Sequence, residues 1–97
     1  MKFYLLSDDK ATKTGLRLAG IDGELVQRSK ENFKEAFDRS LTNEEIAVLL
    51  ITENLKNLMP EYVELKKATT YLPLIATLPN LPSNVVTNDQ IRPKNEY

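Results

Sequence analysis

The sequence contains no cysteine, no histidine and no tryptophan. Without cysteine the chain has no disulfide, no thiolate nucleophile and no Cys-type zinc site. Without histidine it has no imidazole base and no ordinary transition-metal ligand. Composition alone therefore excludes most catalytic arrangements, and only tyrosine and phenylalanine remain to stack on a base or a sugar ring.

A charge imbalance and long hydrophobic runs are also missing. Thirteen basic and fourteen acidic residues leave a net charge of -1, so no overall field attracts nucleic acid or an anionic membrane. The longest apolar run is Ile46–Ile51, far short of the roughly twenty residues that span a bilayer. The amino-terminal stretch turns acidic at Asp8 and Asp9, too early for a signal peptide. We expect a soluble cytoplasmic chain that neither binds nucleic acid nor inserts into a membrane.

The run Ile46–Ile51 is the segment around which the chain is organised. It is apolar without alternation and rich in β-branched residues, which is typical of a strand covered on both faces. Such a strand needs helices above and below it. The flanking sequence predicts them, because apolar residues recur there at spacings of three and four. Those residues are Phe33, Ala36 and Phe37 before the run, and Leu55, Leu58, Met59, Tyr62 and Val63 after it.

Strand and helix signals alternate along the rest of the chain. In order, we predict a strand at 3–6, a helix at 10–19, a strand at 24–28, a helix at 30–39, the strand at 46–51, a helix at 54–68 and a strand at 74–78. The weak hydrophobicity of 24–28 and the prolines around 74–78 indicate edge strands.

Several single positions refine this outline. Gly20 is predicted at the C′ position of the first helix, with Leu16 and Ala19 on its inner face. Gly15, inside that helix, is interpreted as a point of close approach to the sheet. Ser29 is predicted to cap the second helix. Pro60 predicts a kink or a restart in the third.

Three strand–helix units and a last strand predict an α/β fold of the Rossmann-like or flavodoxin-like kind. We expect a four-stranded parallel sheet in the order 2-1-3-4, flanked by helices. Residues 1–79 are predicted to form this domain and residues 80–97 a C-terminal tail, largely extended or flexible. In the tail, Val85, Val86 and Ile91 are expected to dock on the domain or on a partner.

The first and third strands of this sheet would end side by side, at Asp8 and Asp9 and at Glu53. Three carboxylates at such a switch point could hold Mg²⁺, as in the receiver domain of a response regulator. The third strand, however, ends in Thr52–Glu53 where a receiver has its phosphoacceptor aspartate, and no lysine follows the last strand. The alternative is structural, with Asp8 or Asp9 capping the first helix and Thr52 or Asn54 the third.

No nucleotide signature accompanies this crevice. Gly15, Gly20 and Gly23 are too far apart for a phosphate-binding loop, and Gly20–Gly23 does not follow the first strand. No catalytic residue, cofactor or resident metal is predicted.

Four segments resemble the F subunit of the V-type rotary ATPases, a family that includes archaeal and bacterial ATP synthases. They lie in the same order and at similar spacing, and the second and third are the most specific. The segments are Lys2–Asp8, Thr14–Gly23, Ala47–Glu53 and Pro73–Pro79.

The resemblance implies a non-catalytic component of the central stalk. In that family a small Rossmann-like domain binds the coiled-coil rotor protein, the D subunit. The stalk couples ATP hydrolysis or synthesis in the A/B head to proton or sodium ion transport through the membrane ring. A receiver-like signalling domain that binds Mg²⁺ at Asp8 and Asp9 is the alternative.

Overall fold

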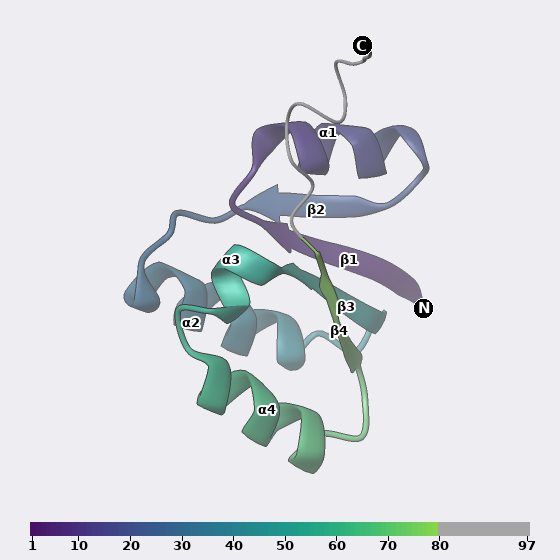
Figure 1. Ribbon diagram of the computed structural model, residues 1–97. Coiled ribbons are helices and arrows are strands. Elements are labelled where there is room, and N and C mark those ends of the chain that lie inside the picture. The colour runs from purple at the N-terminus through teal and green to yellow at the C-terminus, as the bar shows by residue number, and fades with distance from the viewer. Residues whose placement is uncertain (80–97) are drawn as a thin grey trace, which may run out of the picture.

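A computed structural model describes residues 1–79 of the chain, in which strands and helices alternate (Figure 1). The elements are β1 (Lys2–Ser7), α1 (Lys10–Leu18), β2 (Asp22–Leu25), α2 (Lys30–Leu41), β3 (Ile46–Thr52), α3 (Glu53–Lys56), α4 (Pro60–Thr69) and β4 (Leu74–Leu78). The strands form one parallel sheet in the order β2-β1-β3-β4. The predicted fold class and strand order are confirmed, while the predicted tail, 80–97, lies outside the described residues.

The helices divide unequally between the two sides of the sheet. α1 lies on one side, and α2 and α4 lie on the other (Figure 1). This division follows from right-handed crossovers, because the chain moves one way along the sheet from β1 to β2 and the other way from β2 to β3 and from β3 to β4. α1 packs on β1 and β2.

The main core lies between the sheet and α2 with α4. Phe33 and Phe37 of α2 are fully buried and stack with ring centroids 5.2 Å apart, and the Tyr62 ring of α4 meets Phe37 edge-on at 5.9 Å. Leu49 and Ile51 of β3 face this core and are fully buried. Aromatic rings in these arrangements add to the stability gained from burial.

On its other face β3 is less well covered than the sequence predicted. Val48 and Leu50 alternate with Leu49 and Ile51, and both are only half-buried. The prediction of a strand covered on both faces is therefore right for one face and wrong for the other. The reason is topological, since only α1 lies on that side within residues 1–79 and it sits over β1 and β2.

Of the two predicted glycine roles, that of Gly20 is confirmed, and that of Gly15 belongs to Gly23 instead. Gly20 has φ +90° and follows the C-cap Ala19, as predicted. A Cβ at Gly15 would meet nothing within 4 Å, so its predicted approach to the sheet is wrong. Gly23 is the residue in close approach, because a Cβ there would lie 2.6 Å from the carbonyl oxygen of Leu5.

That close approach accompanies a shift in the second strand. β2 begins at Asp22 and ends at Leu25, earlier than the predicted 24–28, with Gly23 opposite Leu5 in the register. Ala19 is exposed and lies beyond the last residue of α1, so its predicted place on the inner face is wrong. Leu16 is half-buried, as that prediction requires.

The predicted third helix is two helices. α3 ends at Lys56, and α4 begins with Pro60 in its first turn. The restart at Pro60 is confirmed, because proline lacks an N–H but fits the first turn of a helix, where that donor has no intrahelical partner.

Thr77 of β4 provides a stability test. Its hydroxyl oxygen is buried and has no hydrogen-bond partner among the described residues. Thr77→Val replaces that hydroxyl by a methyl group of similar shape, and we expect it to raise the free energy of unfolding by about 1 kcal/mol, measured by urea denaturation. Thr69→Val is the control, because the Thr69 hydroxyl is exposed and donates to the Leu65 carbonyl. A loss of stability in Thr77→Val would show that the hydroxyl has a partner.

Candidate functional site

The carboxyl ends of β1 and β3 bring one acidic side chain into a dense set of hydrogen-bond donors. Asp8 follows β1, and its side chain is only 2% exposed. Its Oδ1 accepts a hydrogen bond from the Thr52 hydroxyl at 2.7 Å. Its Oδ2 accepts from the Asn54 side-chain amide at 3.0 Å and pairs with Arg28 Nε at 2.7 Å. Asp8 therefore ties together the segments that follow β1, β2 and β3.

These donors determine the charge state of Asp8. Burial would raise the pKa of its carboxyl, but hydrogen bonds from Thr52 and Asn54, with the nearby Arg28 charge, lower it below the ordinary value. The carboxylate is thus ionised at neutral pH, and both of its oxygens are engaged by protein donors.

Asp9 has a separate role, one of the two that the sequence left open. It is the N-cap of α1, and its Oδ2 accepts from the Thr12 amide at 3.2 Å and from the Thr12 hydroxyl at 2.6 Å. Ser7 Oγ accepts from the Asp9 amide at 2.9 Å. Capping of α1 by Asp9 is confirmed, and this hydrogen bonding directs its carboxylate to its own helix.

The third carboxylate of the predicted cation site does not complete it. Glu53 is exposed in the first turn of α3. Within residues 1–79 no group of three or more acidic side chains is placed to hold a metal ion. The carboxylate-cluster interpretation is therefore wrong for this part of the chain. Thr52 occupies the N-cap position of α3, as one of the two alternatives predicted, but its hydroxyl donates to Asp8 and does not cap the helix.

Arg28 belongs to this group although no sequence motif predicted it. Its position is the one signal available, since it lies just past the end of β2, the neighbour of β1. The carboxyl ends of parallel strands meet at one edge of a sheet, so residues that follow β1, β2 and β3 are expected to lie close together.

A second polar cluster links β1, β2 and α2. Glu24 Oε1 accepts from the Tyr4 hydroxyl at 2.7 Å, and Arg39 donates to both Glu24 oxygens at 3.1 and 2.8 Å. Burial and the Glu24 carboxylate raise the pKa of Tyr4 to about 12. With the phenol neutral and the carboxylate paired bidentately, this cluster is suited to structural cross-linking rather than to proton transfer.

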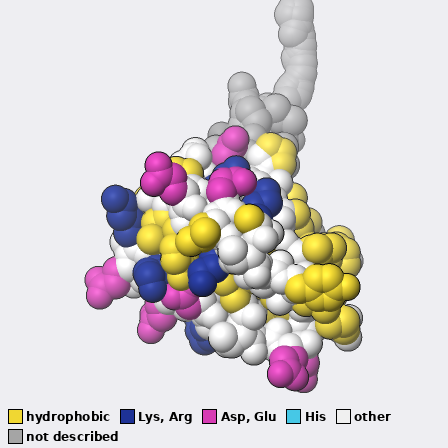
Figure 2. All heavy atoms as spheres, turned by 90° about the horizontal axis from the view of Figure 1, so that it is seen from below, with side chains coloured by type: hydrophobic (Ala, Val, Ile, Leu, Met, Phe, Trp, Pro, Cys, Tyr) yellow, Lys and Arg dark blue, Asp and Glu magenta, His cyan; other side chains and the backbone are white. Residues whose placement is uncertain are grey.

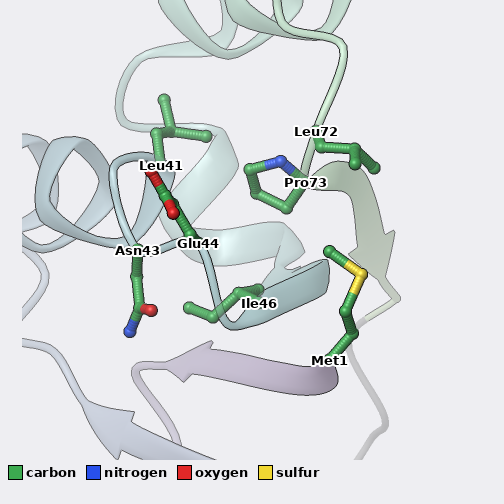
Figure 3. Close-up of a pocket in the computed structure, with 7 residues that line it drawn as sticks. All are labelled: Met1, Leu41, Asn43, Glu44, Ile46, Leu72 and Pro73. Atoms are coloured by element: carbon green, nitrogen blue, oxygen red, sulfur yellow. The ribbon is translucent and has the colours of Figure 1, made fainter.

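A pocket of about 320 Å³ opens at the opposite, amino end of the sheet (Figure 3). Its apolar lining comes from four segments, with Met1, Leu41, Ile46, and Leu72 with Pro73 around the opening. The polar lining residues are Asn43, whose side-chain oxygen accepts from the Glu45 amide, and Glu44. Ligand sites usually contain several convergent polar groups, so this pocket is better suited to an apolar side chain than to a substrate.

The face of residues 1–79 that Figure 2 shows has no large field of one sign. Figure 2 shows basic and acidic side chains interspersed around groups of hydrophobic ones on the face seen from below. No helix within residues 1–79 has the length and hydrophobicity to cross a bilayer. The predicted docking residues Val85, Val86 and Ile91 lie outside the described residues.

Comparison with known proteins identifies the family. Residues 5–94 match the family model described as ATP synthase (F/14-kDa) subunit. The fold is similar to the crystal structure of the F subunit of the V-type ATP synthase from Archaeoglobus fulgidus, with a TM-score of 0.65 and 19% sequence identity over 79% of this chain and 95% of that one. No curated protein matches the sequence. The chain therefore belongs to the ATP synthase (F/14-kDa) subunit family.

Proposed function

We propose that this chain is a non-catalytic rotor component of the central stalk, which binds a coiled-coil partner, the D subunit of the same complex. The observation that carries the proposal is the family match over residues 5–94. In this role the chain helps to couple ATP hydrolysis or synthesis in the A/B head to proton or sodium ion transport through the membrane ring. It works in the cytoplasmic, soluble sector, at the membrane but outside it.

The geometry of the carboxyl edge supports a mechanical role. In an α/β enzyme this edge is where a ligand is expected. Here the Asp8 carboxylate accepts from Thr52 and Asn54 and pairs with Arg28, so the groups that could meet a ligand hold the strand ends together. A protein that transmits torque benefits from such internal ties, because they resist relative movement of the strands.

The two parts of the chain have different roles in this proposal. We assign residues 1–79 to the folded body and residues 80–97 to a distinct segment whose apolar residues Val85, Val86 and Ile91 make a docking contact.

Co-purification with the coiled-coil protein from the same genome tests the assignment. We expect one-to-one assembly in size-exclusion chromatography with light scattering, retained between low and moderate salt, and no ATP hydrolysis by the isolated chain. Separate elution of the two proteins at every salt concentration would overturn the rotor assignment.

Incubation with Mg²⁺ and a small phosphodonor such as acetyl phosphate tests the receiver alternative. For a rotor component we expect the mass of the chain to stay unchanged, because Asp8 is buried and paired. A phosphoryl adduct on wild type that is missing in Asp8→Asn would favour the signalling function instead.

A further inference from the structure

The amino end of the sheet carries most of the exposed apolar side chains of the described residues. Eight large hydrophobic side chains are exposed within residues 1–79, and five of them belong to two segments, 1–3 and 71–74. The two segments are neighbours, because Met1 and Leu72 line the same pocket (Figure 3). Apolar side chains gathered in this way indicate a protein–protein contact. We call this surface the amino-end patch and define it as Met1, Phe3, Tyr71, Leu72 and Leu74.

The pocket beside this patch can receive a side chain from outside. Its volume of about 320 Å³ is at the low end for a ligand site but is large enough for one aromatic side chain. Asn43 and Glu44 lie on one side of it, and Met1 and Leu72 lie on the other (Figure 3). The Glu44 carboxylate is exposed and has no ion-pair or hydrogen-bond partner within residues 1–79. The pocket therefore combines apolar walls with an unpaired acceptor at its rim.

Tyr71 has the chemistry that this pocket fits. It directly precedes Leu72 and is 89% exposed, the highest value among the exposed hydrophobic side chains of residues 1–79. Its ring is apolar and its hydroxyl is a hydrogen-bond donor, which matches the apolar walls and the carboxylate at the rim. Tyrosine is also one of the residues that contribute most to binding energy at interfaces.

A second copy of the chain is the partner that these features select. The exposed Tyr71 and the pocket adjoin in one surface. A two-fold interface brings the same surface of two molecules together, so each tyrosine would meet the pocket of the other copy.

The charges of this surface are compatible with such self-association. Residues 68–79 contain no charged side chain, so like charges do not face each other there. Both signs are present at the rim, where the Lys2 amide donates to the Glu45 carbonyl at 2.8 Å and places these two residues side by side. Across a two-fold axis, the basic side chain of one copy can therefore face the acidic side chain of the other.

We propose that two copies of the chain associate about a two-fold axis, with Tyr71 of each copy in the amino-end pocket of the other and its hydroxyl donating to Glu44. The contacts are reciprocal, so the assembly closes as a dimer and does not extend into a filament. Each inserted ring buries about 150–250 Å², and with the surrounding patch the interface is at the small end of specific ones. The dimer therefore forms in the micromolar range, and it does not depend on the stalk assignment.

Sedimentation equilibrium of the full isolated chain tests the association. Between about 1 µM and about 1 mM we expect a change from monomer to dimer. Tyr71→Ala should raise the dimer Kd at least about tenfold, because an aromatic anchor is lost. Leu18→Ala is the matched control, since Leu18 is 85% exposed but lies at the end of α1, and its Kd should equal that of the wild type. A monomer at every concentration, or an unchanged Kd in Tyr71→Ala, would overturn the proposal.

Cross-linking tests the reciprocal placement of the two side chains. The chain has no cysteine, so Tyr71→Cys and Glu44→Cys can be made as separate single variants, both at exposed positions. The two variants are mixed with a short bismaleimide, and the products are identified by mass spectrometry. We expect the mixed product to form about tenfold faster than either self-linked product, because the contact holds positions 71 and 44 of different copies together.

A self-linked Tyr71→Cys dimer as the main product would overturn the exchange, because it would place both copies of residue 71 at the axis. Sedimentation of the unsubstituted chain decides the matter even where a variant folds poorly. Both experiments use the isolated chain, so failure to bind a coiled-coil partner would not affect their result.

Discussion

Asp8→Ala should lower the free energy of unfolding by about 3 kcal/mol, a large share of the stability of so small a domain. The variant removes an ionised acceptor that is 2% exposed and that receives hydrogen bonds from Thr52 and Asn54. Hydrogen bonds to charged groups contribute about 1.5–3 kcal/mol, and the donors left behind lose their partner in a buried place. Urea denaturation at neutral pH measures the loss.

Asp9→Ala is the matched control for this prediction. It removes the neighbouring carboxylate, which caps α1 from an exposed position. A lost N-cap costs about 1 kcal/mol, so the two adjacent substitutions should differ by roughly threefold in effect. Equal effects would show that the strand-end network at Asp8 is worth no more than an ordinary helix cap.

The same variant should alter the response to acid. Asp8 has a lowered pKa when folded, so its contribution to stability is complete above the ordinary value of 3.8 and is lost as pH falls through the lowered folded-state pKa. As the pH falls below 3.8, the wild type should therefore lose stability more steeply than Asp8→Ala. Glu24 and Asp38 also have lowered pKa values, so part of the acid dependence remains in the variant.

Gly23→Ala is the second substitution with a large expected effect, a loss of about 2–3 kcal/mol. The new Cβ would lie 2.6 Å from the Leu5 carbonyl oxygen and 2.7 Å from Leu5 Cβ. Neither atom can move without shifting β1, which is hydrogen-bonded on both sides in the sheet. Forcing extra volume into such a place typically costs about 1–3 kcal/mol.

Gly15→Ala should have the opposite sign. Gly15 lies inside α1, and a Cβ there would meet nothing within 4 Å. Alanine is favoured over glycine in a helix by up to about 1 kcal/mol. Thermal or urea denaturation of the two variants side by side should thus show one destabilised and one stabilised protein. Stabilisation by both would mean that β2 can move away from β1.

Gly15 and Gly23 also show which features the sequence could not predict. Helix starts and ends are local, so Gly20 and Ser29 were recognised from their immediate neighbours. Whether a glycine faces another backbone depends on register between strands distant in the sequence. Gly23 lies opposite Leu5 only because β2 starts at Asp22, and no local pattern encodes that choice.

For the candidate site, too, the sequence predicted some features and not others. Asp8 was found because the fold class places the ends of β1 and β3 together, and the fold class follows from hydrophobic patterns. Its actual partners depend on side-chain directions, which turned Asp9 toward α1 and brought in Arg28 from the end of β2. The sequence predicted a cation site at the ends of β1 and β3. The structure has an internal ion pair, Asp8 with Arg28, at that same place.

The strand order has a consequence for how the chain acquires its structure. β1 lies between β2 and β3, and its pairing with β3 joins Lys2 to Ile46 and Leu6 to Ile51. On a ribosome, β1, α1 and β2 leave the exit tunnel well before β3 does, so an early β1–β2 unit must wait with one side of β1 unpaired. Parallel pairing over such a sequence distance slows folding and exposes apolar strand edges to other chains. Chaperone dependence and folding yield in this family should therefore be most sensitive to substitutions in β3.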